Sequence, residues 1–140
     1  MYILDTNVVS ELRKAKLGRA NENVVRWANS VEPSSLFISV ISLHELEVGV
    51  RLLERRDSLQ GRIFRAWLDG QVIPAFPDRV LTIDAAVALR SAQLNVPDAR
   101  PIHDGFIAAT ALVHSMTVVT RNTADFAGTG VLLLNPWGTF

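Results

Sequence analysis

Three acidic residues carry the chemistry that this sequence offers: Asp5, Glu45 and Asp104. Carboxylates that lie close together repel one another and raise each other's pKa values. A hard divalent cation relieves that repulsion, and Mg²⁺ or Mn²⁺ suits a site made of a few carboxylates and waters. Such an ion lowers the pKa of bound water and polarises a phosphoryl group. If these residues converge, the chemistry they indicate is phosphodiester hydrolysis.

Other catalytic designs have no counterpart in the sequence. The chain contains no cysteine, which excludes disulfides, thiolate nucleophiles and zinc–thiolate sites. We find no Ser-His-Asp triad, and Gly18, Gly61 and Gly70 fall in no nucleotide-binding pattern. The formal net charge is zero, so overall charge does not indicate a nucleic-acid binder. Two basic stretches fit solvated helix faces and a rim for a polyanionic substrate equally well: Arg13, Lys14, Lys16 and Arg19, and Arg51, Arg55, Arg56, Arg62 and Arg65.

Glu45 stands out because of the direction in which a helix would point it. At about 100° per residue, the apolar arc comprises Leu43, Leu46, Val48, Gly49, Val50, Leu52 and Leu53, and the opposite solvated face comprises Glu47, Arg51, Glu54 and Arg55. Glu45 projects on the apolar side, between Gly49 and Leu52. A carboxylate there requires a proton, a partner or a cation. A buried salt bridge with Arg56 is the alternative to a metal.

Asp5 and Asp104 each have a structural explanation beside the functional one. Asp5 follows an apolar run, and Asp104 follows Pro101, so each lies near the start of a helix, where an anion is stabilised. For Asp5, the following Thr6 and Asn7 are available to cap the helix, which leaves the aspartate free for a site. Asp104 shares its helix face with small residues that allow close approach. His103 beside it is more often structural than catalytic.

The carboxyl ends of the expected strands repeat one pattern. Leu4 runs into Asp5-Thr6-Asn7, Ile38 into Ser39, and Val119 into Thr120-Arg121-Asn122. Ligands of open α/β sheets bind outside the carboxyl ends of the strands, so these side chains predict one shared site. Helix capping is the simpler interpretation for Ser39 and Asn7. Asn122 and Asp125 either face the site or cap the turn.

The elements that must position these residues alternate between strands and helices. Short β-type runs are Tyr2–Leu4, Leu36–Ser39, Val80–Ile83, Thr117–Thr120 and Val131–Leu134. Helical periodicity covers Asn7–Arg13, Asn21–Ser30, Ser42–Arg56, Leu59–Ile73, Ala85–Gln93 and Ile102–Ser115. The pattern predicts a three-layer α/β/α fold around a mainly parallel sheet. No repeat or linker divides the 140 residues, so we expect a single domain over 1–140.

Four segments together resemble the PIN-domain toxins of the VapC family. They are Tyr2–Glu11, Ser42–Gly49, the stretch from Asp104 to Ala111, and Thr120-Arg121-Asn122. The closing Asn135-Pro136-Trp137 is similar to the FitB-like branch of that family. The resemblance spans the whole chain, in order and at fitting intervals. It implies a PIN-like fold, an endoribonuclease that depends on Mg²⁺ or Mn²⁺, a homodimer, and a cognate antitoxin (VapB- or FitA-like) that covers the active site.

Carried over by position, the resemblance makes Asp5, Glu45 and Asp104 the acidic residues that hold metal and activate water. The fourth position, often Asp in the family, is Asn122 here, and Asp125 is the candidate for the missing charge. Thr6, Asn7 and Thr120 would support the acids by hydrogen bonds. The substitution at Asn122 leaves open a second interpretation, a catalytically weak PIN-like module that acts in an antitoxin-led repressor complex.

Two further expectations come from the sequence. A receiver-like phosphoacceptor domain would also be α/β, but it needs an acidic pair near the first strand and a late lysine. Asp5 stands alone there, and no lysine follows Lys16. No signal peptide is visible, and no apolar run reaches the roughly 20 residues that span a bilayer. We therefore expect a cytoplasmic protein without a membrane partner.

Overall fold

The computed structural model describes residues 1–138 and contains one five-stranded sheet in the order β3-β2-β1-β4-β5. The strands are β1 (Tyr2–Leu4), β2 (Leu36–Ser39), β3 (Val80–Leu81), β4 (Thr117–Val119) and β5 (Leu133–Leu134). All neighbouring pairs are parallel, with Tyr2 opposite both Leu36 and Thr117. The mainly parallel sheet predicted from the sequence is thus confirmed, although its last three strands are shorter than the apolar runs that mark them.

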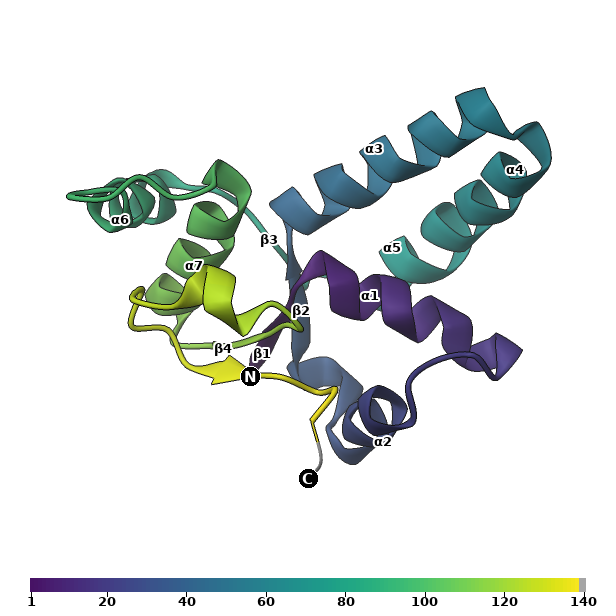
Figure 1. The fold of residues 1–140 in the computed structure, drawn as a ribbon, viewed down its shortest axis with the longest axis horizontal. Coiled ribbons are helices and arrows are strands. Elements are labelled where there is room, and N and C mark those ends of the chain that lie inside the picture. Colours follow the sequence, from purple (N-terminus) through teal and green to yellow (C-terminus); the bar gives the residue numbers. More distant parts are fainter. Residues whose placement is uncertain (139–140) are drawn as a thin grey trace.

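Helices cover both faces of the sheet, because successive strand residues point to opposite sides. Leu4 and Val119 pack into one core, together with Trp27, whereas Ile3 and Val118 pack into another. The first core receives α1 (Thr6–Arg13), α2 (Glu22–Ser30), α3 (Val40–Arg56) and α4 (Ser58–Trp67), and α6 (Ala85–Leu94) and α7 (Ile102–His114) lie on the other face (Figure 1). The α/β/α architecture is confirmed.

Helices α3 and α4 form an antiparallel pair, here called the arm, that projects away from the sheet (Figure 1). The helical segment predicted over Leu59–Ile73 is present, but it is not one regular α-helix. Helix α4 ends at Trp67, a π-helical turn (η3) follows over Leu68–Val72, and a short α5 covers Ile73–Ala75. Pro74 has no backbone N–H to donate and its ring clashes with the carbonyl four residues earlier, so the regular α-helical hydrogen-bond pattern is interrupted in the turn before it. The wide turn keeps Leu68 and Val72 buried in the core.

The outer surface of α3 differs from the sequence expectation. Glu47 and Arg51 form the expected ion pair, at 2.6 Å. Glu47 is nevertheless not simply solvated, because Arg65 of α4 donates to both of its carboxylate oxygens at 2.7 and 2.8 Å. Arg65 also binds Glu54 at 3.0 Å. Part of the apolar arc is exposed instead, with Leu52 at 60%. Helix α4 packs against the charged face of α3 and leaves part of the apolar arc exposed. The sequence of α3 alone does not reveal this neighbouring helix.

The remaining turns are short 3-10 helices: η1 (Lys14–Leu17), η2 (Pro33–Ser35) and η4 (Thr123–Phe126). Strand order places β1 between β2 and β4, with the chain continuing outward on both sides. The crevice between the carboxyl ends of β1 and β4 is therefore the switch point at which α/β sheets bind ligands. In residues 1–138, no helix has the length and apolar character needed to cross a bilayer.

Candidate active site

Asp5 lies at this switch point, and both of its carboxylate oxygens are held. It follows β1 and is 7% exposed. Its Oδ1 accepts the Thr6 backbone N–H at 2.8 Å, and Oδ2 accepts the Thr120 hydroxyl at 2.8 Å. Burial raises the pKa of Asp5, the hydrogen bonds from Thr120 and Thr6 lower it, and the charges of Glu45 and Asp125 raise it further. The net shift is upward, as expected for a buried carboxylate near like charges.

Asn7 does not cap helix α1, in contrast to the simpler interpretation of its sequence position. The cap is Asp5 itself. The Asn7 amide instead reaches across the crevice, donating to Asp5 Oδ2 at 3.3 Å and to Thr120 Oγ1 at 3.4 Å. Its carbonyl oxygen accepts the Arg121 backbone N–H at 3.3 Å. Asn7 thus links the ends of β1 and β4. Ser39 is a cap, as expected, accepting the Ile41 N–H at 3.0 Å.

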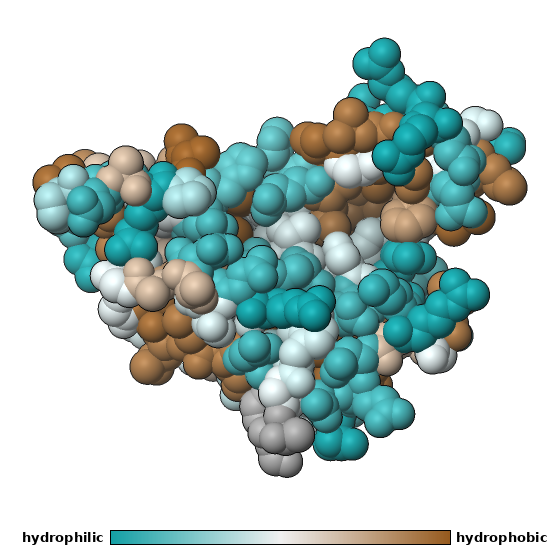
Figure 2. Space-filling view, in the orientation of Figure 1, coloured by the Kyte–Doolittle hydropathy of each residue, from teal (hydrophilic) through white to brown (hydrophobic). Residues whose placement is uncertain are grey.

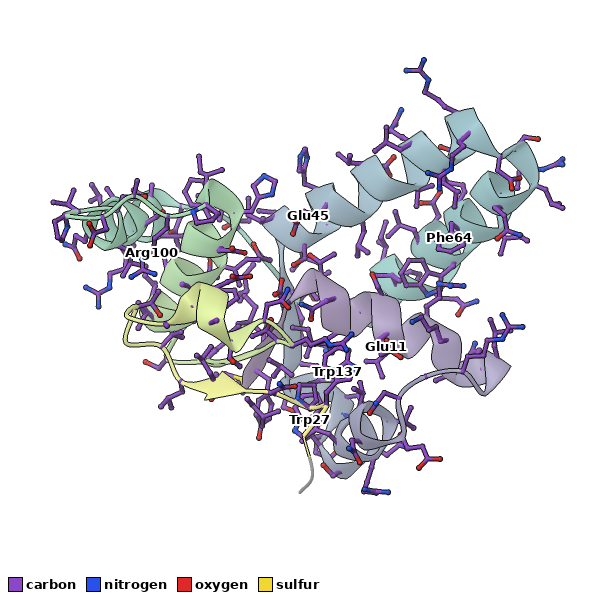
Figure 3. All side chains as sticks on the ribbon, in the orientation of Figure 1. Glu11, Trp27, Glu45, Phe64, Arg100 and Trp137 are labelled. Carbon is purple, nitrogen blue, oxygen red and sulfur yellow. The ribbon has the colours of Figure 1, made fainter. Side chains whose placement is uncertain are left out.

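Glu45 projects from the start of α3 toward the same region (Figure 3). Its Oε1 accepts the Thr6 hydroxyl at 2.7 Å. Its side chain is 34% exposed, so it is less buried than the helix projection indicates. No ion pair with Arg56 forms within the described chain. Glu45 is held by a hydroxyl from α1, and its carboxylate remains open to a ligand.

His103, for which the sequence favours a structural role, is a neighbour of this site. Its Nδ1 lies 3.4 Å from Glu45 Oε2, and its ring meets that of His44 edge-on, with centroids 5.7 Å apart. His103 is next to Asp104 in the sequence, but its contact with Glu45, 58 positions earlier in the chain, could not be foreseen. Only the packing of α3 against α7 brings the two together. A histidine one residue before a candidate acidic ligand is the signal that could have indicated it.

Asp104 lies in the first turn of α7, as the sequence predicts. Burial raises its pKa, and the charges of Asp5, Asp125 and Glu45 raise it further, whereas His103 lowers it. Asp104 is therefore within electrostatic reach of the other acids. Ala108 and Ala111, on its helix face, are fully buried in the core that includes Ile3 and Val118. The small side chains let α7 lie close to the sheet, which places Asp104 at the carboxyl ends of the strands.

Two exposed residues after β4, Asn122 and Asp125, are the candidates for the fourth site residue. Asn122 donates its backbone N–H to Thr120 Oγ1 at 3.0 Å. Asp125 lies in η4, where its backbone N–H donates to the Asn122 carbonyl at 3.0 Å. The Asp125 charge raises the pKa values of both Asp5 and Asp104. Asn122, a neutral amide, contributes no such charge.

The donor set fits a hard divalent cation. All the acidic groups offer oxygen ligands, and Asp5 and Asp104 carry raised pKa values that a bound cation would relieve. In residues 1–138, no three acidic or histidine side chains are already arranged around a single metal position. The fit is thus one of charge and ligand chemistry, and side-chain adjustment would complete it.

Comparison with known proteins agrees with this fold. A family model described as PIN domain matches residues 2–131. The chain is 37% identical over 142 residues to the toxin FitB of Neisseria gonorrhoeae, covering 98% of this chain and 99% of that protein. It is 37% identical over 145 residues to the VapC ribonuclease Y4jK of Sinorhizobium fredii, covering 98% of each. The crystal structure of FitAcB from Neisseria gonorrhoeae matches with a TM-score of 0.89 at 35% identity, over 99% of this chain and 100% of that one.

A parallel sheet between two helical layers, with acidic residues gathered at its carboxyl edge, defines the class of this protein as an α/β/α domain with an acidic site. Within that class, the family match and the two full-length relatives identify it further. The chain belongs to the PIN-domain family. The resemblance seen in the four sequence segments is thereby confirmed.

Proposed function

We propose that this protein is a metal-dependent endoribonuclease and the toxin of a toxin–antitoxin pair. The observation that carries the proposal is the convergence of acids at the sheet edge, where the charges of Asp5, Asp125 and Glu45 all raise the pKa of Asp104. Such a set of carboxylates attracts a divalent cation more strongly than any one of them would. A relative named as a VapC ribonuclease, and another named as a toxin, support this activity.

In this proposal Asp5 and Asp104 are the principal metal ligands, and Glu45 completes the ligand set or orients the attacking water. Bound Mg²⁺ or Mn²⁺ would supply a nucleophilic hydroxide near neutral pH and stabilise charge on the phosphate. Asn122 or Asp125 would hold a second ion or its hydration water. Oxygen donors and the resemblance to VapC toxins favour Mg²⁺ or Mn²⁺ as the bound ion.

The other side chains of the site act on these acids. The Thr120 hydroxyl and the Asn7 amide both donate to Asp5 Oδ2, which fixes the plane of that carboxylate. The Thr6 hydroxyl occupies one oxygen of Glu45 at 2.7 Å. The second oxygen, which lies 3.4 Å from His103 Nδ1, would accept a proton from the attacking water.

The proposed partners follow from the same assignment. As a toxin of this type, the protein would act with an antitoxin that covers the active site, and it would form a homodimer. Because its proposed substrate is RNA, we expect it to act in the cytoplasm.

The direct test is cleavage of labelled RNA by the wild type and by Asp5→Ala and Asp104→Ala, with Mg²⁺, with Mn²⁺ and with EDTA. We expect cleavage only by the wild type and only with added metal. Equal activity in all three proteins would overturn the site assignment. If the wild type binds no divalent cation in calorimetry and does not cleave RNA, the catalytically weak binding module that Asn122 suggests takes its place.

A further inference from the structure

We propose that a pocket beside Glu45 binds one unpaired nucleotide of the RNA, next to the phosphodiester that is cleaved. The assignment of the cleaved bond rests on the proposed nuclease function, whereas RNA binding by the pocket does not. The pocket has a volume of about 420 Å³ and opens to solvent. Ligand pockets of proteins usually measure about 300–1,000 Å³, so a single nucleotide is of suitable size.

One end of this pocket belongs to the active site. Thr6 and Glu45, which are hydrogen-bonded to each other at 2.7 Å, line it together with Gly49. From there it extends between α1 and the arm to Phe64 and Trp67 on α4. Figure 3 shows Glu45 near the start of α3 and Phe64 on α4 across from α1. A nucleotide in the pocket would therefore have its phosphate close to the acidic residues.

Two arginines at the pocket carry charge that the protein does not neutralise. In the described part of the chain, neither Arg13 nor Arg56 is within ion-pair distance of a carboxylate, although both line the pocket. Other arginines of the arm are different, since Arg65 and Arg51 are paired with Glu47. Unpaired guanidinium groups along a pocket that opens at the acidic centre would attract the phosphates of RNA and offset the repulsion from the carboxylates.

Arg13 is also held in place before any ligand arrives. Its guanidinium carbon lies 4.1 Å from the centroid of the Phe64 ring. Stacking of this kind restricts the side chain, so less conformational entropy is lost when it binds a phosphate or a base. Phe64 meets Trp67 edge-to-face, with the ring centroids 6.2 Å apart. The wall of the pocket thus combines a guanidinium plane and aromatic surface with the aliphatic side chains of Leu46, Val50 and Leu53.

That combination fits an unpaired nucleotide. Proteins recognise single-stranded RNA by stacking bases on aromatic rings and guanidinium planes and by binding phosphates with cations. Figure 2 shows hydrophobic residues gathered over the arm, beside the hydrophilic surface near the site. A purely apolar peptide would leave Arg13 and Arg56 without partners, so the charges of the pocket favour a polyanion. A protein segment as occupant is the competing outcome of the test.

The first experiment measures binding of a short, fluorescein-labelled single-stranded RNA by anisotropy in EDTA, at several KCl concentrations. We expect Arg13→Gln and Arg56→Gln to raise Kd by about threefold or more and to reduce the salt slope by about 0.7 each, the value for one lost phosphate contact. Arg55→Gln and Arg62→Gln are matched controls, because both are exposed on the arm and line no part of this pocket. If Arg56→Gln behaves like Arg55→Gln, the pocket does not bind RNA and the proposal is overturned.

The second experiment tests the base without relying on a mutant that could unfold. An RNA with one abasic nucleotide at the cleaved position should bind the wild type about tenfold more weakly, the scale of one stacked base. Phe64→Leu should bind intact RNA more weakly but show little further loss with the abasic RNA. An equal abasic penalty in both proteins would exclude stacking at Phe64.

The two proposals fail separately. If the wild type cleaves RNA and Kd is unchanged in Arg13→Gln and Arg56→Gln, the nuclease function is supported and RNA binding by the pocket is contradicted. If these variants bind RNA more weakly but the wild type shows no metal-dependent cleavage, RNA binding by the pocket is supported and the nuclease function is contradicted.

Discussion

The Thr120 hydroxyl donates a hydrogen bond to Asp5 Oδ2 over 2.8 Å, across a separation of 115 positions in the chain. Thr120 is fully buried and Asp5 almost so. The same hydroxyl oxygen accepts the Asn122 backbone N–H at 3.0 Å. One buried threonine therefore connects the carboxylate after β1 with the loop after β4, and the two sides of the candidate site are oriented together.

Replacing Thr120 by valine should reduce RNA cleavage by about 10- to 100-fold, the usual cost of losing a group that orients a metal ligand. Valine keeps the shape but removes the donor, and the pKa of Asp5 should rise further because this hydrogen bond lowers it. The pH at which activity appears should shift upward in Thr120→Val. Cleavage rates across a pH series measure both effects, and Thr120→Ser, which keeps the hydroxyl, is the control. Wild-type rates in the valine variant would show that the bond does not position Asp5.

Asp104→Asn should stabilise the metal-free protein at neutral pH while it abolishes cleavage. The pKa of Asp104 is raised above 3.8 in the fold, so its ionised form costs free energy of folding. That cost is present above the folded pKa and disappears as the pH falls below the unfolded value. We expect Tm in EDTA at pH 7 to rise by about 2–5 °C, with the gain vanishing toward pH 3. Exposed Asp98→Asn should leave Tm unchanged, and a lower Tm in Asp104→Asn would contradict the electrostatic account.

Asp125→Asn should weaken divalent-cation binding several-fold, because the Asp125 charge reaches both Asp5 and Asp104. Asn122→Asp should strengthen binding by adding a carboxylate at the neighbouring position. Calorimetric titration with Mn²⁺ measures both changes, with Asn122→Gln as the control that alters size and not charge. Unchanged affinity in Asp125→Asn, together with weaker binding in Asn122→Gln, would make Asn122 the fourth site residue instead.

Gly61→Ala should destabilise the protein, although alanine is the better helix former. A Cβ at Gly61 would lie 2.5 Å from the Glu54 Cα, so α3 and α4 would have to separate. We expect a loss of about 1–3 kcal/mol in the free energy of unfolding, as for other overpacked contacts. At Gly49, also within a helix, a Cβ would meet no atom within 4 Å. Gly49→Ala should therefore stabilise by about 0.5–1 kcal/mol, and urea unfolding would reveal the opposite signs.

Arg65→Gln should lower Tm by a few degrees at neutral pH and low salt, because Arg65 joins α4 to Glu47 and Glu54 of α3. The Arg65 hydrogen bonds are the main reason that the pKa of Glu47 is lowered from 4.5 to about 2. A lowered carboxylate pKa stabilises the fold above the unfolded value, and the contribution is lost as the pH falls from 4.5 toward 2. The difference in Tm between wild type and variant should shrink over that range. High salt should also reduce it, because these groups are partly exposed.

Arg62→Gln is the control for this network, since Arg62 is exposed on the same helix and takes part in none of its ion pairs. A constant difference between Arg65→Gln and the wild type from pH 7 to pH 2 would mean that Arg65 acts through packing and not through charge.

Local patterns in the sequence determined most of the fold. Apolar runs mark the positions of the five strands, and helical periodicity marks α1, α2, α3, α6 and α7 to within a few residues. Residues on both sides of each strand are apolar, which is why a sheet covered on both faces could be expected. These features depend on neighbours in the chain, so a linear sequence contains them. The π-helical turn before Pro74 was missed because the periodicity of its apolar residues does not change there.

The sequence alone nominated the acids of the site, and the tertiary structure decided what surrounds each one. The approach of α7 to α3 brings His103 to Glu45, and the parallel pairing of β1 with β4 brings Thr120 to Asp5. The approach of α4 to α3 turns Glu47 from a solvated residue into the partner of Arg65. Hydrogen bonds, desolvation and the repulsion between carboxylates all depend on distances between segments far apart in the chain. Residue types can name the groups that do the chemistry, but only the packing of the helices on the sheet sets those distances.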